Sequence, residues 1–309
     1  MTVTHKLMRI EMRIGLDLGG TKIEGILLSN GGAIEQKVRV ETPSDNYRKT
    51  VDSICRLVKS LQPPTPVPVG IGTPGSLVLP EGLMKNSNSV CLNNKPLQRD
   101  VETKLGYEIR IENDANCFIL SEAIYGAAAD AQSAFGVILG TGCGGGFVIN
   151  KRLVTGPNGI AGEWGHNCIP VSVRDLIKQD RICHCGRTNC IETVISGRGL
   201  AQTHFENFNQ TLEASEIAQL AENNNSDAMK SIDTYAQQLA YSLVTIVNMV
   251  DPHSIVLGGG ISNIRALYEL VPKYLNHVIF NDAVHTKILP PAFGDASGAI
   301  GAACLWPEN

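Results

Sequence analysis

The first part of the chain alternates between apolar and polar positions in three short segments separated by glycine pairs. Met12–Asp17 runs into Gly19-Gly20, Ile23–Leu28 follows, and Gly31-Gly32 leads into Lys37–Glu41. Alternation with a period of two is typical of strands, and tight glycine turns join antiparallel neighbours. The pattern therefore predicts an antiparallel meander of three strands at the start of the protein.

Helical and strand-like patterns then alternate over the next 70 residues or so of the sequence. Residues 46–61 carry large apolar side chains at helical spacing, and the proline-rich stretch 63–68 ends this helix. A buried strand at Val67–Ile71, a helix from Pro96 to Gly106 and a strand at Tyr107–Ile111 follow. The order of these elements predicts one half of a two-part α/β molecule.

The same order partly recurs in the second half of the chain. A buried strand at Ala134–Leu139 ends in Gly140–Gly146, Phe147–Asn150 returns antiparallel, and Lys151–Val154 predicts a third strand. Beyond it we expect a long amphipathic helix that ends at Asp251-Pro252, a strand at Ser254–Leu257 and a helix at Ser297–Leu305. Two glycine-turned hairpins at the heads of two similar halves indicate an internal duplication.

Composition narrows the class of protein. The 309 residues are 43% hydrophobic and 18% charged, and the net charge of -4 argues against nucleic acid as a partner. No apolar stretch approaches the roughly 20 residues that cross a bilayer. Residues 1–11 lack the apolar core of a secretory signal, so we expect a short extension there. Nine cysteines scattered through apolar segments favour a reducing cytoplasm over a disulfide framework.

The two glycine turns are candidate phosphate sites. Glycine backbone approaches an anion closely, Thr21 adds a hydroxyl, Lys22 adds charge, and Asp17 could orient Mg²⁺. The turn is not a P-loop, which precedes a helix, and a glycine hairpin is more often only a hairpin. We expect these residues to bind ATP: Asp17, Gly19, Gly20, Thr21 and Lys22 in the first turn, and Gly140, Thr141, Gly142, Cys143 and Gly144 in the second.

A third glycine cluster, Gly258, Gly259 and Gly260, follows the predicted strand at Ser254–Leu257 and precedes Ser262, a candidate helix N-cap. Backbone without side chains would suit the adenine or ribose of a nucleotide. A tight structural turn explains the same residues equally well.

Asn113-Asp114-Ala115-Asn116 lies where a predicted strand meets an apolar helix. Asp114 could simply cap that helix or act as its first-turn acid. Alternatively, it could be a general base that takes a proton from a hydroxyl as it attacks phosphorus, with Asn113 bonding a neighbouring hydroxyl. A polyol substrate needs several such groups, and Glu163, His166 and Glu192 could supply them.

His166, Cys183, Cys185 and Cys190 are spaced as ligands of one tetrahedral metal ion. Three thiolates and an imidazole are typical of a closed structural zinc site, which leaves no open position for a catalytic water. Three unrelated thiols beside a surface histidine are the simpler alternative. We interpret the metal as a clamp that directs Glu163 and Glu192 at the two ends of the ligand set.

With these residues in place, the chain resembles the ROK family of sugar kinases and repressors from about Met12 to its end. The resemblance rests on motifs already described, together with Gly72-Thr73-Pro74-Gly75 and Lys85-Asn86-Ser87-Asn88-Ser89. It implies an actin-like (ribonuclease H-like) ATPase fold of two similar α/β domains. We expect the smaller domain at residues 12–115 plus 296–309 and the larger at 116–295, with ATP in the cleft between them.

The resemblance also implies residue roles: Asp114 as catalytic base, zinc on His166, Cys183, Cys185 and Cys190, and the sugar on Gly75, Asn88, Asn113, Asp114, Glu163, His166 and Glu192. Within the family, Trp164 and the segment 85–89 look most like bacterial fructokinases, because N-acetylglucosamine kinases typically carry Phe at the position of Trp164. The 16 residues between His166 and Cys183 exceed the number in many family members.

The leading hypothesis is an ATP- and Mg²⁺-dependent fructokinase that acts at the 6-hydroxyl and also accepts mannose or glucose. An N-acetylglucosamine kinase or another hexose kinase of the family is the alternative. A sugar-sensing repressor is disfavoured because only 16 residues precede Asp17, too few for a helix-turn-helix domain. A sugar-binding protein without catalysis would be expected to lose Asp114 or the glycine turns. We expect a homodimer that binds hexose and ATP, without nucleic acid or membrane.

Overall fold

The computed structural model describes residues 12–43, 45–78, 80–87 and 89–308. Residues 1–11, the expected N-terminal extension, and Asn88, an expected sugar ligand, lie outside the described residues. The chain forms two compact units. Unit 1 contains the described residues up to Tyr125, Gly156–Gly159 and the segment from Asp295 onward, and unit 2 contains Gly126–Thr155 and Ile160–Gly294.

Unit 1 is built on a five-stranded sheet in the order β3-β2-β1-β4-β7. β1, β2 and β3 are antiparallel neighbours, whereas β4 and β7 continue the sheet parallel to β1. Its strands and helices are β1 (Met12–Leu18), β2 (Lys22–Ser29), β3 (Ile34–Glu41), α1 (Tyr47–Leu61), β4 (Val69–Thr73), β5 (Ser76–Val78), β6 (Leu83–Lys85), α2 (Leu97–Leu105), β7 (Arg110–Asn113), α3 (Asp114–Ile124) and α10 (Ser297–Ala303). The predicted meander is confirmed.

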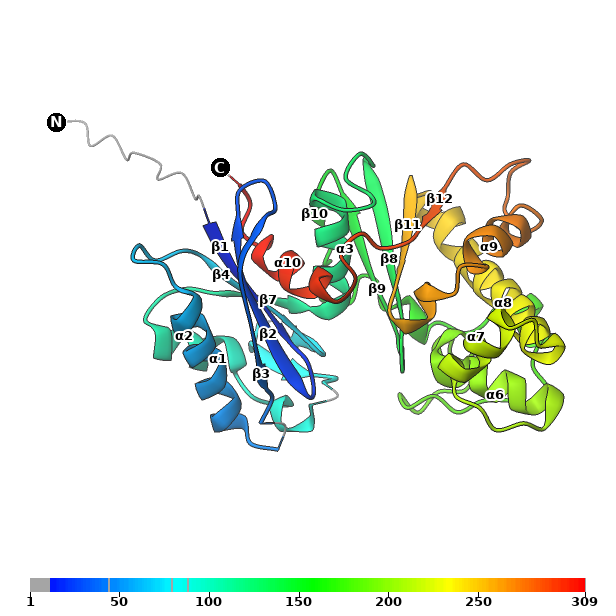
Figure 1. Ribbon diagram of the computed structural model, residues 1–309, viewed down its shortest axis with the longest axis horizontal. Helices are drawn as coiled ribbons and strands as arrows, with labels where there is room; N and C mark the ends of the chain where they lie inside the picture. The colour runs from blue at the N-terminus through cyan, green and yellow to red at the C-terminus, as the bar shows by residue number, and fades with distance from the viewer. Residues whose placement is uncertain (1–11, 44, 79, 88, 309) are drawn as a thin grey trace. The chain divides into compact units, whose positions relative to one another are not determined.

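Helices cover both faces of the unit 1 sheet, α1 and α2 on one side and α10 with α3 on the other (Figure 1). Alternation along β1 points Ile14, Leu16 and Leu18 into a core that α1 closes with Ile54 and Leu57. The opposite face of the sheet packs against α10. The side chains of α10, sequence SGAIGAA, are mostly small, so the helix can approach the strands closely. The last helix of the chain therefore belongs to the first unit.

Unit 2 repeats this plan with the sheet order β10-β9-β8-β11-β12. β8, β9 and β10 are antiparallel neighbours, and β11 and β12 run parallel to β8. Its elements are β8 (Ser133–Leu139), β9 (Cys143–Ile149), β10 (Arg152–Leu153), α4 (Val171–Arg174), α5 (Glu192–Ile195), α6 (Gly197–Phe208), α7 (Ala214–Glu222), α8 (Ser226–Val250), β11 (Ser254–Gly258), α9 (Leu267–Leu275) and β12 (Lys287–Leu289). The matching strand orders support the predicted duplication.

Helices α6, α7, α8 and α9 gather on one side of the unit 2 sheet (Figure 1). The 25-residue α8 supplies the largest share of this core, because its apolar residues recur at helical spacing from Ala228 to Val247. The hydroxyl of Tyr235, which is fully buried, donates a hydrogen bond to the carbonyl of Ile195. The loop that carries the cysteines leads into α5 and α6 on the edge of this core.

Several predicted elements differ from the structure. β4 and β7 begin two and three residues later than expected, β4 because Pro68 lacks the N–H group that a ladder needs. The predicted turn Gly140–Gly146 is shorter, since β9 already begins at Cys143. The hairpin of β5 and β6 was not predicted. Ser262 is no N-cap: it lies inside a 3₁₀ helix, Gly260–Asn263, and its hydroxyl donates to the carbonyl of Gly259.

The observed division of the chain also differs from the expected one. The boundary falls after Tyr125 rather than after residue 115, so α3 belongs to unit 1. The physical reason is packing, because α3 lies directly against α10 and the hydroxyl of Ser297 donates to the Glu122 carboxylate at 3.1 Å. A sequence pattern places α3 after β7 but does not show which unit buries it.

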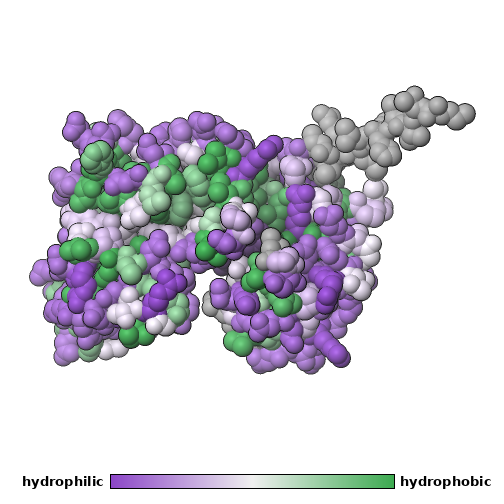
Figure 2. Space-filling model, turned by 180° about the vertical axis from the view of Figure 1, so that it is seen from behind, coloured by the Kyte–Doolittle hydropathy of each residue, from purple (hydrophilic) through white to green (hydrophobic). Residues whose placement is uncertain are grey.

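Exposed apolar residues are scattered over the described surface. Figure 2 shows a face on which hydrophilic residues predominate and hydrophobic residues form small groups. The most exposed large apolar side chains are those of Val90, Val171, Ile182, Met249 and Phe280. In the part of the chain that the structure describes, no helix combines the length and apolar character needed to cross a bilayer.

Candidate active site

Two predicted functional carboxylates lie close together in unit 1. Asp17 is near the end of β1, and Asp114 directly follows β7. β4 joins these two strands, since Gly72 pairs with Asp17 on one side and with Glu112 on the other. Parallel strands end at the same edge of a sheet, and open α/β sheets bind their ligands at that edge. The topology therefore brings together residues that are almost 100 positions apart in the sequence.

The electrostatics confirm this proximity. The pKa of Asp17 is raised to about 6, mainly by burial and next by the negative charge of Asp114, whereas Lys22 has the opposite effect. A Cβ atom at Gly298 in α10 would come within 2.9 Å of the Asp17 carboxyl group, which shows how closely this helix covers the residue. A carboxylate with a raised pKa beside another carboxylate is typical of a functional site that binds a cation.

The structure shows which residue caps α3. Asn113 is the N-cap of α3, because its side-chain oxygen accepts a hydrogen bond from the backbone N–H of Asn116 at 2.7 Å. Asp114 is the first residue of the helix and is exposed, with one carboxylate oxygen accepting from the N–H of Ala115 at 2.8 Å. The cap is thus Asn113, and Asp114 is an acid of the first helical turn.

The first glycine turn joins β1 to β2 and is braced by Thr42. The N–H of Gly19 donates to the carbonyl of Lys22 at 2.9 Å, and the Thr42 hydroxyl donates to the carbonyl of Gly19 at 2.8 Å. Gly20 and Thr21 are exposed at the tip. The ammonium group of Lys22 lies 3.7 Å from the Asp295 carboxylate. The turn has the exposed backbone that a phosphate site needs. Its cation, Lys22, is paired with the exposed carboxylate of Asp295.

Gly75 follows β4 in a left-handed conformation with φ of 85°. A Cβ atom at this position would come within 2.4 Å of the carbonyl of Lys85. Glycine is therefore required there by the close approach of β6, whatever contact the residue makes with a sugar.

A cavity of about 450 Å³ in unit 2 is lined by residues from four segments of the chain, two of them predicted as ATP-binding and two not. Gly140 and Thr141 from the second glycine turn line it together with Gly260 from the third cluster. Arg198, Glu213 and Ser215, none of which the sequence suggested, complete the polar part of its wall. The one local signal for Arg198 is Ser196, a helix N-cap residue whose hydroxyl accepts from the N–H of Gly199.

The remaining residues of unit 2 that were predicted to bind ATP do not line this cavity. Gly258 is the buried last residue of β11, and a Cβ atom at Gly259 would come within 2.4 Å of the Leu139 carbonyl. Cys143 and Gly144 belong to β9, and burial raises the pKa of the Cys143 thiol well above its ordinary value. Of the predicted set, the structure brings Gly140, Thr141 and Gly260 to one cavity and does not bring Gly142, Cys143, Gly144, Gly258 and Gly259 there.

Gly142 serves another purpose, because it admits the carboxylate of Glu192. One Glu192 oxygen accepts from the N–H of Cys143 at 2.9 Å, and a Cβ atom at Gly142 would come within 2.7 Å of that oxygen. The other Glu192 oxygen lies 2.8 Å from Nδ1 of His184. Glu192 is therefore fixed between the glycine turn and the cysteine loop. Glu163 lies exposed just before the 3₁₀ helix that carries His166.

The four predicted metal ligands come together. His166, Cys183, Cys185 and Cys190 offer ligand atoms that all lie within 4.8 Å of one another. Sγ of Cys183 is 3.6 Å from Nδ1 of His166, and Sγ of Cys185 is 3.6 Å from Sγ of Cys190. A tetrahedral zinc ion with Zn–S bonds of about 2.3 Å separates its ligands by about 3.5–3.8 Å. A disulfide needs about 2.05 Å, so the spacing fits metal ligands.

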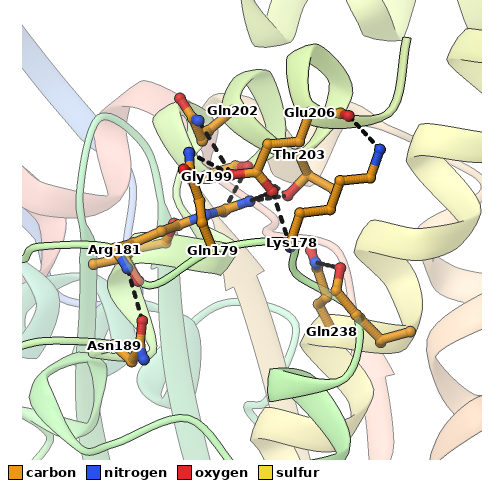
Figure 3. A network of polar contacts seen from close by, with 11 residues as sticks. Lys178, Gln179, Arg181, Asn189, Gly199, Gln202, Thr203, Glu206 and Gln238 are labelled. Atoms are coloured by element: carbon orange, nitrogen blue, oxygen red, sulfur yellow. Dashed lines mark hydrogen bonds and ion pairs between the residues drawn. The ribbon is translucent and has the colours of Figure 1, made fainter.

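The cysteine loop is tied to α6 by a buried ion pair. The Arg181 guanidinium lies 3.0 Å from Glu206 and also donates to the Thr203 hydroxyl and to the carbonyls of Thr193 and Gly199 (Figure 3). Asn189, in the same loop, accepts from the N–H of Arg181 at 2.8 Å. This network positions the start of the loop against α6.

Comparisons with known proteins cover nearly the whole chain. The sequence matches the ROK family over residues 13–309. It is 37% identical to an N-acetyl-D-glucosamine kinase of Pasteurella multocida over 96% of this chain and 99% of that protein. Among solved structures, a ROK hexokinase from Thermus thermophilus superposes with a TM-score of 0.83 at 27% identity, covering 94% of this chain and 96% of that chain.

A ROK family glucokinase from Streptomyces griseus, solved with glucose and AMPPNP, superposes with a TM-score of 0.79 at 26% identity. The match covers 96% of this chain and 100% of that chain. These likenesses, with the repeated sheet order, confirm the predicted actin-like fold of two similar α/β units.

Proposed function

The chain belongs to the ROK family, and from this premise we propose that it is an ATP-dependent N-acetylglucosamine kinase. It would transfer the γ-phosphoryl group of ATP to the 6-hydroxyl of the sugar. The observation that carries the proposal is 37% identity over nearly the full length of both chains to a protein named as such a kinase. Further relatives of that name, from Photobacterium profundum and Salmonella among others, are equally similar.

Fructose, the sugar favoured by the sequence motifs, finds no such support. That preference rested on the segment 85–89 and on Trp164, which is 6% exposed and packs edge-on against Phe135 with ring centroids 6.1 Å apart. Because Trp164 packs in the core of unit 2, its identity is a weak marker of sugar preference.

In unit 1, Asp114 would act as the general base. It would accept the proton of the attacking hydroxyl while the new O–P bond forms and the bond to the β-phosphate oxygen breaks. Its exposure and its place at the end of β7 support this role. Asp17 would hold Mg²⁺ through its carboxylate or through bound waters, because a divalent cation would relieve the unfavourable charge beside Asp114.

In unit 2, the cavity lined by Gly140, Thr141 and Gly260 would hold the nucleotide. A larger cavity of about 940 Å³ shares Ala218 and Ile264 with it and could take the base. Glu163, His166 and Glu192 would hydrogen-bond the sugar hydroxyls, as a polyol needs several directed acceptors.

We further propose that His166, Cys183, Cys185 and Cys190 hold a structural zinc ion. Three thiols and one imidazole at tetrahedral spacing support this assignment. When bound, the ion would cross-link the loop to the segment of Glu163 and His166. It would have no role in the chemistry of phosphoryl transfer, because its four ligands are all supplied by the protein.

The test is an ADP-release assay across N-acetylglucosamine, glucose, mannose and fructose, with the wild-type protein and two matched variants. Asp114→Asn should reduce kcat by at least a thousandfold and leave the sugar Kd within about threefold, since the amide cannot accept the proton. Asp100→Asn is the control, because Asp100 is also a first-turn acid of a helix in unit 1.

A kcat/KM for N-acetylglucosamine that exceeds the values for the other sugars would support the proposal. A higher kcat/KM for fructose or glucose would overturn the sugar assignment but leave the kinase assignment. Near-normal turnover by Asp114→Asn would remove this residue from the role of base.

A further inference from the structure

Two cavities of unit 2 share a wall at Thr141 and Arg198. The first is the 450 Å³ cavity proposed above for the nucleotide, and the second, of about 330 Å³, is also lined by Cys183, His184 and Glu192. A group at this shared wall faces the nucleotide on one side and the proposed sugar contact Glu192 on the other. Arg198 therefore lies between the cavity proposed for the nucleotide and the cavity that Glu192 lines.

The backbone fixes Arg198 relative to the glycine turn. Arg198 is the second residue of α6, and the N–H of its predecessor Gly197 donates to the carbonyl of Gly140 at 2.8 Å. Ser196 caps the same turn through its contact with the N–H of Gly199 at 3.2 Å. The backbone position of Arg198 is thus set by a helix that is bonded directly to the turn that lines the nucleotide cavity.

The charge of the cavity wall makes this arginine distinctive. Among the described residues that line the 450 Å³ cavity, Arg198 is the only cation, and Glu213 is the only acid. Whereas Arg181 is buried and paired with Glu206, Arg198 is exposed and forms no ion pair with any described residue. A guanidinium group of this kind suits phosphate, which it can bind through two parallel hydrogen bonds.

We propose that Arg198 binds the terminal phosphates of ATP. The inference rests on the proposed function, since it assigns a further catalytic residue to the same nucleotide cavity. The guanidinium stabilises negative charge on the γ-phosphoryl oxygens while the sugar oxygen bonds to phosphorus. As the bond to the β-phosphate oxygen breaks, its electron pair stays on ADP. The adenosine part of the nucleotide lies outside the reach of this residue.

The experiment compares Arg198→Gln and Arg198→Lys with Arg152→Gln. Arg152 is an exposed arginine of the same unit, on β10, and lines none of the cavities described above. Calorimetric titration measures the Kd of ADP and of adenosine for each protein, and initial rates give the KM for ATP and for the sugar. The adenosine arm separates loss of a phosphate contact from collapse of the cavity.

We expect Arg198→Gln to raise the Kd of ADP and the KM for ATP at least tenfold. The Kd of adenosine and the KM for the sugar should stay within about twofold. Arg198→Lys should recover part of the loss because it restores the charge but not the paired hydrogen bonds, and Arg152→Gln should behave as the wild type.

An unchanged Kd of ADP in Arg198→Gln would overturn the inference, and so would an equal loss of adenosine and ADP affinity. Neither result would contradict the proposed function as long as the wild-type protein phosphorylates the sugar with ATP. A wild-type protein that binds no ADP would overturn both.

Discussion

At the scale of single residues, burial of Asp17 sets its chemistry. Its pKa of about 6 in the folded protein lies above the ordinary value of 3.8. Between these two values the folded state binds more protons than the unfolded state. The free energy of unfolding therefore falls as the pH rises from about 4 to about 6, and the cost persists at neutral pH. Function would explain why a destabilising carboxylate occupies this position.

We predict that Asp17→Asn raises the free energy of unfolding at about pH 7 by up to about 3 kcal/mol, because it removes the buried charge. The difference from the wild type should shrink toward about pH 4, where the native carboxyl group is already protonated. The same variant should lose at least tenfold in turnover. Urea unfolding at both pH values and the ADP-release assay measure these effects. A variant no more stable than the wild type at neutral pH would contradict the argument.

Trp164 shows how a residue can mislead when only its identity is known. Its ring belongs to the core of unit 2, and its indole N–H points to the carbonyl of Gly144 at 3.5 Å. Since this contact is long, we expect the ring volume to matter more than the hydrogen bond. A difference between Trp and Phe at this position changes packing rather than the groups that meet a sugar.

We predict that Trp164→Phe lowers the free energy of unfolding by about 1–2 kcal/mol, as a large-to-small core substitution does. The ratio of kcat/KM for N-acetylglucosamine to that for fructose should change by less than about twofold. Chemical denaturation and the substrate panel provide both quantities. A shift of that ratio by tenfold or more would show that Trp164 does determine sugar specificity.

At the scale of elements, the cysteine loop depends on α6 for its position. Arg181 and Glu206 have side chains that are only 7% and 6% exposed. Burial alone would raise the pKa of Glu206, but hydrogen bonds and charge from Arg181 outweigh it and hold the pKa below its ordinary value. The pair therefore stabilises the fold at neutral pH, and this contribution is lost as the pH falls below about 4.5.

We predict that Glu206→Ala lowers the free energy of unfolding by about 3 kcal/mol or more at neutral pH, because it leaves a buried guanidinium without its partner. Glu222→Ala, which removes an exposed acid from α7, should change it by less than about 0.5 kcal/mol. Denaturant unfolding gives both values, and hydrogen exchange should show faster exchange at residues 178–190. Equal stability of the two variants would mean that the loop holds its place without this ion pair.

At the scale of the whole molecule, the two units share one topology but carry different chemistry. Each sheet has three antiparallel strands followed by two parallel ones. Unit 1 holds the carboxylates Asp17 and Asp114, whereas unit 2 holds the glycine-lined cavity and the cysteine loop. The same topology therefore carries different functional groups in the two units.

We predict one zinc ion per chain, found by metal analysis in the wild type and in Cys168→Ser but absent from Cys190→Ser. Cys168 is exposed and lies outside the ligand set. Removing the metal with a chelator should lower Tm by about 5–10 °C, since 1 kcal/mol corresponds to about 2–4 °C in domains of this size. Faster hydrogen exchange should be confined to unit 2. Metal-free wild-type protein of full stability would refute the zinc assignment.

Local sequence patterns were sufficient for most elements because strand alternation, glycine turns and helix caps act over a few neighbouring residues. The meander of β1, β2 and β3, the long helix α8 and the start of a helix directly after β7 follow from such patterns. The cluster of His166 with three cysteines was predicted for the same reason, since Cys183, Cys185 and Cys190 lie within eight positions of one another.

Only the tertiary structure decided which distant residues meet, because parallel strand pairing and helix packing join segments that no local pattern relates. The approach of Asp17 to Asp114 depends on β4 between their strands. Likewise, the neighbourhood of Gly140 and Arg198 depends on the hydrogen bond from α6 to the glycine turn. The core position of Trp164 and the place of α3 in unit 1 were settled in the same way, by the partners against which each was buried.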